Sequence, residues 1–386
     1  MRKTNVLAVI MCISALLLTG CWDKNEPERL VYAIGMGLDY NEGQYEIFIQ
    51  LLNFSTLAKT EGGGSQNPDQ VEAGHAKGKT IDEAIFNLYN SSDRLIFWGD
   101  LSYVVYTEKV LKKKGIQELT DFLNRYRETR YQMYYFATKD SVGDIMKATP
   151  MMNRSVAYSK LSDPRNSYKQ NSFIRPISMR KVIIELDEPP HQTALPVVKS
   201  EDNRWNSTEL GPRTSLTIDG VSVIDRSKSK GIIGGNDITG FRWMTDGMNR
   251  QSLPIYKDGK FVASMLIYDV KVKAEPVEIG EKLRFNIKIK MKSASELFTE
   301  NVTVDFLKQE IQKEIKKQIK NTFHKSLELD ADLYRLSASV YRGNKELWKK
   351  YSQNGRITLD EGSIQSITIE NMVTDVGKQQ MEPTLK

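Results

Sequence analysis

Hydrophobic and polar residues alternate along the first part of the chain as they do in β-strands. Leu30, Tyr32 and Ile34 take every second position, a turn follows at residues 39–43, and the alternation resumes over 45–51. A period of two places successive side chains on opposite faces of a strand, so this pattern predicts a β-hairpin over residues 29–54. The polar stretch at 58–79 contains EGGGSQNPDQ and is expected to form a long loop. A loop of this length is either functional or disordered, and we favour disorder.

Strand-like and helical periods then alternate. Residues 80–83 (TIDE) have the capping-box pattern that opens a helix, and apolar residues follow on one helical face. Alternation predicts strands at 101–106 and 131–137, with a helix at 115–128 between them, and Ser141 is placed to cap a further short helix. This order of elements predicts a sheet with helices packed against it.

The pattern breaks between about 187 and 215, where four prolines lie in a stretch without a sustained period. Such a composition favours an interdomain linker. Short strands are expected over 215–270. The glycine-rich GIIGGND at 231–237 lacks the lysine and hydroxyl residues of a phosphate-binding loop, so its glycines are assigned to turns.

The last third of the chain combines strands with one long amphipathic helix. Strands are expected at 269–274 and 284–291, and a helix over 305–328 with Leu307, Ile311, Ile315 and Ile319 as its buried stripe. The lysines on its other side could meet anionic lipid headgroups. They could also form a solvated outer face, which we favour because acidic residues accompany them. These segments predict an α/β (α+β) fold with an N-terminal domain at 21–195, a middle domain at 196–270 and a C-terminal domain at 271–386.

A basic start and a short apolar run open the chain. Arg2 and Lys3 precede the run at 6–18, which is too short to span a membrane and is typical of a secretory signal. Leu18-Thr19-Gly20-Cys21 resembles the bacterial lipobox. Residues 1–20 are therefore expected to be a lipoprotein signal peptide that is cleaved between Gly20 and Cys21. The lipid on the Cys21 sulfur would hold the protein on a bilayer. The alternative is an ordinary signal peptide that leaves Cys21 as a spare thiol.

Composition limits the chemistry of the remaining chain. The full chain of 386 residues carries a net charge of +6 and two cysteines, and cleavage would remove Cys12 and two positive charges. With a single, lipidated cysteine, disulfides and thiolate metal sites are excluded. The small, dispersed positive charge does not indicate nucleic-acid binding. We expect the mature chain to lie outside the membrane, on its extracytoplasmic face.

Recognisable catalytic motifs are absent from the sequence. The three histidines, His75, His191 and His324, are far apart, and neither HExxH nor GxSxG occurs. A pair of catalytic carboxylates stays open, since carboxylates are plentiful and nothing selects two of them. We therefore expect no enzyme activity, no cofactor and no metal.

Several stretches resemble the Ger(x)C lipoproteins, the C subunits of spore nutrient-germinant receptors. They are GCWDKNE at 20–26 with GMGLD at 35–39, RLIFWGD at 94–100, FLNRYRETR at 122–130, DGVSV at 219–223, and DLY at 332–334 with Trp348. The likeness covers nearly the whole mature chain. Departures from the family pattern are Asp100 in place of histidine, Tyr126 in place of aspartate and Ser337 in place of glycine.

The resemblance implies three mixed-sheet α/β domains of unusual topology. It also implies a non-enzymatic, lipid-anchored subunit on the spore inner membrane that acts with receptor A and B membrane subunits in the response to nutrients. Trp22, Asp23 and Glu26 follow the lipid directly and could contact headgroups or a membrane partner, or else pack as an entry strand on the first domain. Direct nutrient binding by this subunit is not expected. The alternatives are a solute-binding lipoprotein of an importer and an anchored cell-wall hydrolase.

Overall fold

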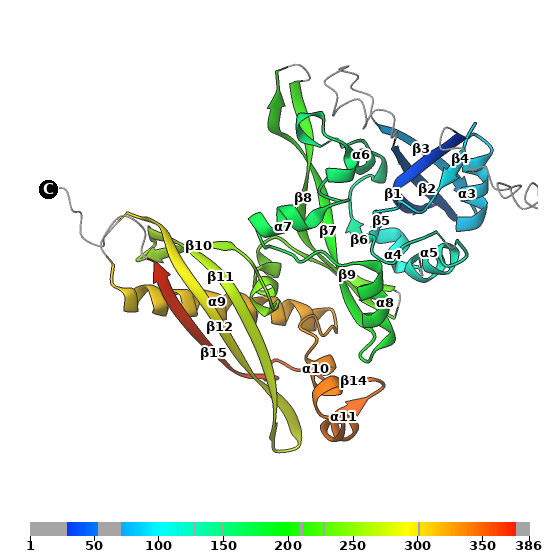
Figure 1. Ribbon diagram of the computed structural model, residues 1–386. Helices are drawn as coiled ribbons and strands as arrows, with labels where there is room; N and C mark the ends of the chain where they lie inside the picture. Colours follow the sequence, from blue (N-terminus) through cyan, green and yellow to red (C-terminus); the bar gives the residue numbers. More distant parts are fainter. Residues whose placement is uncertain are drawn as a thin grey trace, which may run out of the picture.

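The computed structural model of the protein describes residues 29–52, 71–113, 115–126, 128–148, 150–208, 211–226, 228–299 and 302–375. These residues form a mixed α/β fold, which confirms the expected fold class. A nine-stranded sheet lies in one part of the molecule and a four-stranded sheet in another, and a two-stranded sheet lies near the second (Figure 1).

The nine-stranded sheet has the order β3-β2-β1-β5-β6-β7-β8-β9, and β4 also pairs with β1. Its centre, from β1 through β5 and β6 to β7, is parallel, while the pairs toward both edges are antiparallel. Its strands are β1 (Leu30–Asn41), β2 (Gln44–Leu52), β3 (Val71–Gly78), β4 (Leu95–Phe97), β5 (Tyr103–Thr107), β6 (Tyr134–Thr138), β7 (Gln192–Ser207), β8 (Gly211–Asp225) and β9 (Lys228–Gly234).

The opening hairpin is confirmed. Tyr40 on β1 lies opposite Tyr45 on β2, and the two turn residues Glu42 and Gly43 have φ values of 50° and 83°. Positive φ at both central residues is typical of the tight hairpin turn whose twist matches that of the strands. Tyr45, Ile47 and Ile49 of β2 enter the core as their period predicts. The alternation expected in β1 is not seen in its burial: Leu30 and Tyr32 are only partly buried, and the strand is buried without interruption over residues 33–38 because it lies inside the sheet with both faces covered.

The expected disordered loop at 58–79 is wrong for its last part. Residues 71–78 form β3, which pairs antiparallel with β2 over its whole length, and the rest of the expected loop lies outside the described residues. Small residues hide this strand, because VEAGHAKG has no run of large apolar side chains. One glycine has a packing reason: a Cβ at Gly78 would lie 2.4 Å from the backbone nitrogen of Ala84.

Helices α3, α5 and α6 lie at the expected places beside the nine-stranded sheet, whereas α4, α7 and α8 were not predicted. Thr80 caps α3 by accepting the N–H of Glu83 at 3.1 Å, and the Glu83 carboxylate accepts the N–H of Lys79 at 2.6 Å. Ser141 caps α6 as predicted. The helix expected at 115–128 ends at Leu123, and the following strand begins at Tyr134. The helices of this part are α3 (Ile81–Tyr89), α4 (Glu108–Lys112), α5 (Gly115–Leu123), α6 (Val142–Lys147), α7 (Pro164–Gln170) and α8 (Met179–Asp187), with short 3-10 turns η2 (Met151–Asn153) and η3 (Val156–Tyr158).

The linker expected between 187 and 215 is also wrong. Strands β7 and β8 fill it and pair as a long antiparallel ribbon that extends beyond the rest of the sheet (Figure 1). The prolines mislead because a strand tolerates proline where no ladder hydrogen bond is lost. Strand β7 runs across the expected boundary at 195/196, and β11 runs across the one at 270/271, so a division at these points would cut both strands. Where independent domains divide stays a prediction.

The four-stranded sheet has the order β10-β11-β12-β15 and carries the long helix α9 on one face (Figure 1). All four residues of the predicted helical stripe are fully buried, which confirms the amphipathic helix. The elements of this part are β10 (Gln251–Lys257), β11 (Lys260–Ile279), β12 (Lys282–Phe298), α9 (Val304–Glu328), α10 (Leu336–Gly343), α11 (Lys345–Tyr351), β13 (Ser352–Gln353), β14 (Arg356–Ile357) and β15 (Ile364–Asp375).

The 3-10 helix η4 (Gly235–Met244) connects the two sheets and packs on α9. Trp243 is fully buried and donates its indole N–H to Gln318 at 2.7 Å, and a Cβ at Gly240 would lie 2.2 Å from the Gln318 carbonyl oxygen. Ile238 joins residues of β8 and of the segment after α9 in one small core. Gly235, from the glycine-rich stretch, has a φ of 57° where η4 begins, which fits its assignment to a turn.

Candidate functional site

The anchor residues predicted from the sequence, Gly20, Cys21, Trp22, Asp23 and Glu26, lie outside the described residues. The structure locates the point to which they connect. Strand β1 begins at Leu30, which pairs with Leu95 on β4. The N-terminal segment therefore joins the nine-stranded sheet at the start of β1.

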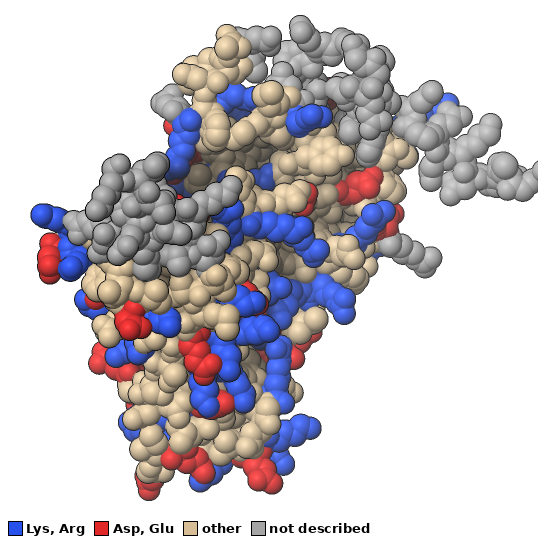
Figure 2. All heavy atoms as spheres, turned by 60° about the vertical axis from the view of Figure 1, so that its left-hand side comes forward, with Lys and Arg blue, Asp and Glu red and all other residues tan. Residues whose placement is uncertain are grey.

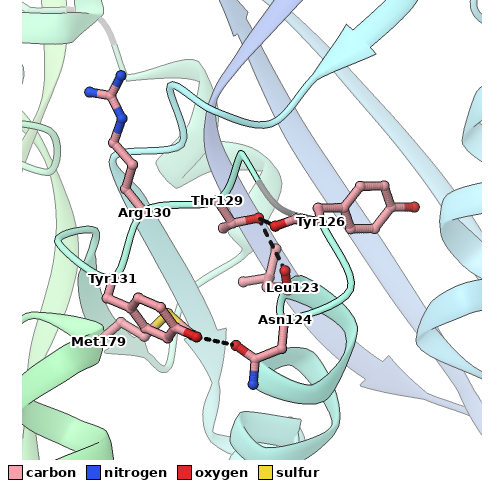
Figure 3. A pocket seen from close by; sticks show the side chains of 7 residues that line it. All are labelled: Leu123, Asn124, Tyr126, Thr129, Arg130, Tyr131 and Met179. Atoms are coloured by element: carbon pink, nitrogen blue, oxygen red, sulfur yellow. Dashed lines mark hydrogen bonds between the residues drawn. The ribbon is translucent and has the colours of Figure 1, made fainter.

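A small pocket lies where α5 ends, within the FLNRYRETR stretch (Figure 3). Its volume is about 120 Å³, and it is lined by Leu123, Asn124, Tyr126, Thr129, Arg130, Tyr131 and Met179. The Tyr131 hydroxyl donates to Asn124 Oδ1 at 3.0 Å, and the Thr129 hydroxyl lies 3.1 Å from the Leu123 carbonyl and 2.9 Å from that of Tyr126. Arg130 points away from the Tyr131–Asn124 pair in Figure 3. These polar groups hold the turn after the helix.

The arginines of this stretch have separate environments. Arg125 forms an exposed ion pair with Asp82 on α3 at 2.7 Å, Arg130 lines the pocket, and Arg127 lies outside the described residues. The described arginines therefore do not converge on one anion-binding point.

The tryptophan of the RLIFWGD stretch lies in a buried aromatic cluster. Trp98 is 1% exposed, donates its indole N–H to the Tyr89 hydroxyl at 2.8 Å, and packs edge-on against Phe122. Tyr126 lies against the same indole. Burial raises the pKa of Tyr89, so its hydroxyl stays protonated and neutral in this cluster. Trp98 thus binds α3 and α5 to the sheet.

The DLY stretch organises the connection between the two parts of the chain. Asp332 is 5% exposed and accepts the backbone N–H groups of Leu336 and Ser337 at 2.8 and 2.6 Å, at the start of α10. Burial raises the pKa of Asp332, and these two hydrogen bonds oppose the rise. The N–H of Asp332 donates to Gln192 on β7 at 2.8 Å. Asp332 therefore fixes both α10 and its contact with the nine-stranded sheet.

An ionic cluster lies beside this connection. Arg335 contacts Glu185 at 3.2 Å and Glu188 at 3.7 Å, both near the end of α8. Arg342 on α10 forms a second ion pair with Glu188. We call Glu185, Glu188, Arg335 and Arg342 the junction cluster. The arrangement binds two parts of the chain together and presents no nucleophile beside a base.

Within the described part of the chain, no group of three or more histidine, cysteine or acidic side chains could hold a metal ion. His75 contacts Glu46 at 3.0 Å and His191 contacts the Leu186 carbonyl at 2.8 Å, in separate places. Among the helices of the same residues, none has the length and apolar character needed to cross a membrane.

Two family models match the chain along most of its length. The model described as "Spore germination protein N-terminal domain" matches residues 23–200, and "Spore germination B3/ GerAC like, C-terminal" matches residues 219–358. The chain belongs to the Ger(x)C family of spore germination proteins.

Named relatives of this Ger(x)C protein come from Bacillus subtilis (strain 168). Spore germination protein KC is 25% identical over 237 residues, which cover 59% of this chain and 58% of that protein. Spore germination protein B3 is 23% identical over 333 residues, covering 85% of this chain and 83% of that one. The match thus spans less than two thirds of the first relative and more than four fifths of the second.

A solved structure shares the fold of this Ger(x)C chain. The crystal structure of the GerBC protein superposes with a TM-score of 0.50 at 16% sequence identity, covering 89% of this chain and 97% of that one. This likeness concerns the fold alone.

Sequence reasoning missed the junction cluster of this Ger(x)C protein. A signal for it exists in the α8 segment, where Glu185 occupies a buried position that the helical period would give to an apolar residue. A buried carboxylate requires a partner, so such a glutamate indicates a contact with a cation from another element. Its partner, Arg335, lies 150 positions further along the chain, and no local pattern predicts that pairing.

Proposed function

We propose that this chain is a lipid-anchored, non-enzymatic subunit of a spore nutrient-germinant receptor, held on the extracytoplasmic face of the spore inner membrane beside receptor A and B membrane subunits. The observation that carries the proposal is the match of both family models, which together extend from residue 23 to residue 358. The relatives' names place them in spore germination. The lipobox-like Leu18–Cys21 stretch supports the anchor.

The described environments of the family-like stretches support a role in holding partners in register. Trp98 is a core residue, Asp332 fixes the connection between the two parts, and a Cβ at Gly220 would lie 2.3 Å from the Ile233 carbonyl oxygen. Residues of these motifs therefore maintain the shape of the body. A rigid body on a lipid tether can act through assembly, without chemistry of its own.

The sheet topology argues against the solute-binding alternative. The nine-stranded sheet has antiparallel strands toward both edges, which differs from two lobes of repeated βα units around a cleft. The lining of the pocket at α5 lacks histidine, cysteine and carboxylate side chains, so this pocket offers no support for a hydrolase.

Germination of a deletion strain tests the proposal. The coding region is deleted in a strain that lacks its other nutrient receptors, and spores are exposed to nutrients and to an agent that bypasses receptors. We expect loss of the nutrient response, an intact response to the bypassing agent, and lower levels of the A and B subunits, because a bound partner stabilises a folded protein. An unchanged nutrient response with unchanged partner levels would contradict the proposal.

A further inference from the structure

The start of β1 and the short strand β4 together form an apolar end of the nine-stranded sheet. Leu30 pairs with Leu95, and Tyr32 pairs with Phe97, with the two aromatic rings edge to face at 5.7 Å between centroids. Residues that are paired, or two positions apart in one strand, share a face of the sheet, so these four side chains lie together on one side. We call Leu30, Tyr32, Leu95 and Phe97 the apolar tip face.

The apolar tip face is only partly covered by the rest of the described chain. Leu95 is 66% exposed, and the other three members are partly exposed. None of the four belongs to the hydrophobic cores that the described residues form. On the opposite side of the same strand pair, Ile96 is 7% exposed and belongs to the main core. Single exposed apolar residues are normal, whereas a group of them on one surface marks an interaction site.

Packing partners on this side of β1 begin only one step further along the strand. Ile34, two positions after Tyr32, is 4% exposed. It packs with Val156 and with Leu52, the β2 partner of Tyr32. The apolar pattern of β1 therefore extends to the end of the sheet, past the residues that the protein itself buries. In water, an uncovered strand end is expected to carry polar side chains, so the apolar ones indicate an occupant from outside the chain.

The length of chain before β1 brings the proposed lipid within reach of this face. The nine residues from Cys21 to Leu30 reach at most ~30 Å even when fully extended. Strand β4 begins beside Leu30 and lies on the side of the nine-stranded sheet that is turned away from the four-stranded sheet (Figure 1). A lipid on Cys21 would thus hold the bilayer close to the apolar tip face.

The chemistry of the apolar tip face suits the interfacial layer of a bilayer. Leucine and phenylalanine gain free energy when their apolar area leaves water, and tyrosine is enriched where headgroups meet acyl chains. An exposed arginine precedes each strand, Arg29 before Leu30 and Arg94 before Leu95. An arginine beside an apolar group can keep its charge at the lipid phosphates while the apolar side chains insert.

The outer side of the four-stranded sheet has the opposite character. Three lysines of β12 form ion pairs with acidic residues of the neighbouring strands: Lys288 with Glu275, Lys290 with Glu370, and Lys292 with Asp269. The lower half of Figure 2, which contains this sheet, shows positive and negative side chains interspersed over the surface. Such a charged surface favours water over lipid.

We propose that the apolar tip face inserts into the interfacial layer of the bilayer and is a second membrane contact beside the lipid on Cys21. This inference rests on the proposed function, because the lipid brings the bilayer to the face. It adds an orientation that a flexible tether alone does not give. Strand β7 runs parallel to β1 through β5 and β6, so Trp205, near the end of β7, lies at the opposite end of the sheet and points away from the bilayer.

Single-cysteine labelling tests this contact. The chain has only Cys12 and Cys21, so a cleaved and lipidated protein offers no competing thiol. The full mature chain, made with its lipid, is reconstituted as Leu95→Cys in vesicles of phosphatidylcholine and phosphatidylglycerol and is labelled with an environment-sensitive fluorophore. Trp205→Cys is the matched control, because Trp205 is 54% exposed at the opposite end of the same sheet. Interfacial residues lie ~5–10 Å into the headgroup region, so nitroxide-bearing lipids should quench the probe at position 95 about twofold or more and leave the probe at position 205 unchanged.

A second reporter guards against a folding defect in Leu95→Cys. Arg94→Cys places the probe at the neighbouring exposed position and keeps all four members of the apolar tip face. Its probe should also be quenched by the nitroxide-bearing lipids. Urea unfolding of each labelled variant shows whether it is folded as the wild type is.

Flotation of the vesicles separates the possible failures. If the labelled proteins do not float with the vesicles, the anchor of the proposed function and this inference are both wrong. If they float and the probes at positions 94 and 95 are quenched no more than the probe at position 205, only the second membrane contact is wrong. A blue shift of the probe at position 95 that requires added A and B subunits, without quenching by the lipids, would identify the face as a protein interface and would also overturn the inference.

Discussion

Arg335 lies 3.2 Å from the carboxylate of Glu185, and this ion pair joins the segment after α9 to helix α8. The two side chains are only 20% and 8% exposed. Glu185 also accepts the Thr193 hydroxyl at 2.6 Å, and Arg335 donates to the Gln192 carbonyl. The contact between the two parts of the chain therefore depends on a largely buried charge pair together with its hydrogen bonds.

Removing the arginine of this pair should destabilise the protein strongly. Arg335→Met leaves the Glu185 carboxylate buried with Lys181 as its remaining ion partner, at 3.3 Å. Breaking a buried pair from one side costs about 3–5 kcal/mol, and we expect the lower end because Lys181 remains. Urea unfolding of the mature chain measures the change. Arg342→Met is the matched control, since its ion pair with Glu188 is more exposed and should contribute about 0–1 kcal/mol. Equal losses in both variants would contradict this account of the junction cluster.

A methyl group at Gly240 should separate η4 from α9. Its Cβ would lie 2.2 Å from the Gln318 carbonyl oxygen and 2.7 Å from the Ile319 Cα, which are backbone atoms of a packed helix. Gly240→Ala should cost about 1–3 kcal/mol, because overpacking forces the backbone to shift.

The matched control for that substitution is Gly343→Ala near the end of α10. Apart from its chain neighbours and the backbone of its own helix, no atom lies within 4 Å of the Cβ that would be added there. Alanine is the better helix former by about 1 kcal/mol, so this variant should be neutral or slightly stabilised. Thermal unfolding of both variants checks the prediction, and an unaffected Gly240→Ala would show that η4 does not depend on this close approach.

Asp360 should make stability sensitive to acid. A hydrogen bond from Arg284 is the main cause that lowers the pKa of Asp360 to about 2, and Lys282 adds to it. An unfolded aspartate has a pKa of about 3.9, so between these values the unfolded chain binds more protons than the folded one. The stabilisation is present above pH ~4 and is lost as the pH falls toward ~2.

Urea midpoints measured from pH ~5 down to ~2 test that contribution. Asp360→Asn should lose less stability than the wild type as the pH falls over this range. In the Arg284→Met background, proteins with and without Asp360→Asn should lose nearly the same stability, because the main cause of the lowered Asp360 pKa is gone. Because Asp360 is 42% exposed, solvent weakens the effect and the change should be modest. Identical acid profiles of wild type and Asp360→Asn would show that this pair does not contribute.

The anchor prediction concerns Cys21. Cys21→Ala removes the sulfur that would carry the lipid, so the precursor should remain uncleaved or the chain should leave the membrane fraction. Lipid labelling and detergent-free fractionation, done without the partner subunits, decide the matter. If the alanine variant is labelled with lipid, or is processed and retained as the wild type is, the anchor is not at this residue.

The sequence predicted those elements whose pattern is local. The alternation in β2, the capping box at Thr80 and the stripe on α9 all depend on residues within a few positions of one another, and all three are present in the structure. In each case the side-chain period states which face is buried, and nothing from elsewhere in the chain is needed.

Elements that depend on distant partners were missed. Strand β3 has small residues and is a strand because β2 offers it an open edge. Strands β7 and β8 are polar and contain prolines, yet they pair with each other over most of their length. Local composition indicates the intrinsic tendency of a segment to form a strand. In β3 and in the β7–β8 pair, pairing with a neighbouring strand overrides that tendency.

The same distinction between local patterns and distant partners applies to the candidate functional residues. The lipobox-like stretch ending at Cys21 is a contiguous pattern, so sequence reasoning proposes it although the structure does not describe it. The junction cluster joins residues more than a hundred positions apart and became visible only in the folded chain.

The measurement that tests the central claim most directly is copurification from spore membranes. The chain is tagged at its C-terminus, spore membranes are solubilised in mild detergent, and the proteins bound to the tag are identified and quantified. A receptor subunit should bring down the A and B membrane subunits together, and the Cys21→Ala variant should recover less of both because it is no longer held beside them. Recovery of the tagged wild-type chain in quantity with neither membrane subunit, or with an importer's ATPase instead, would contradict the account.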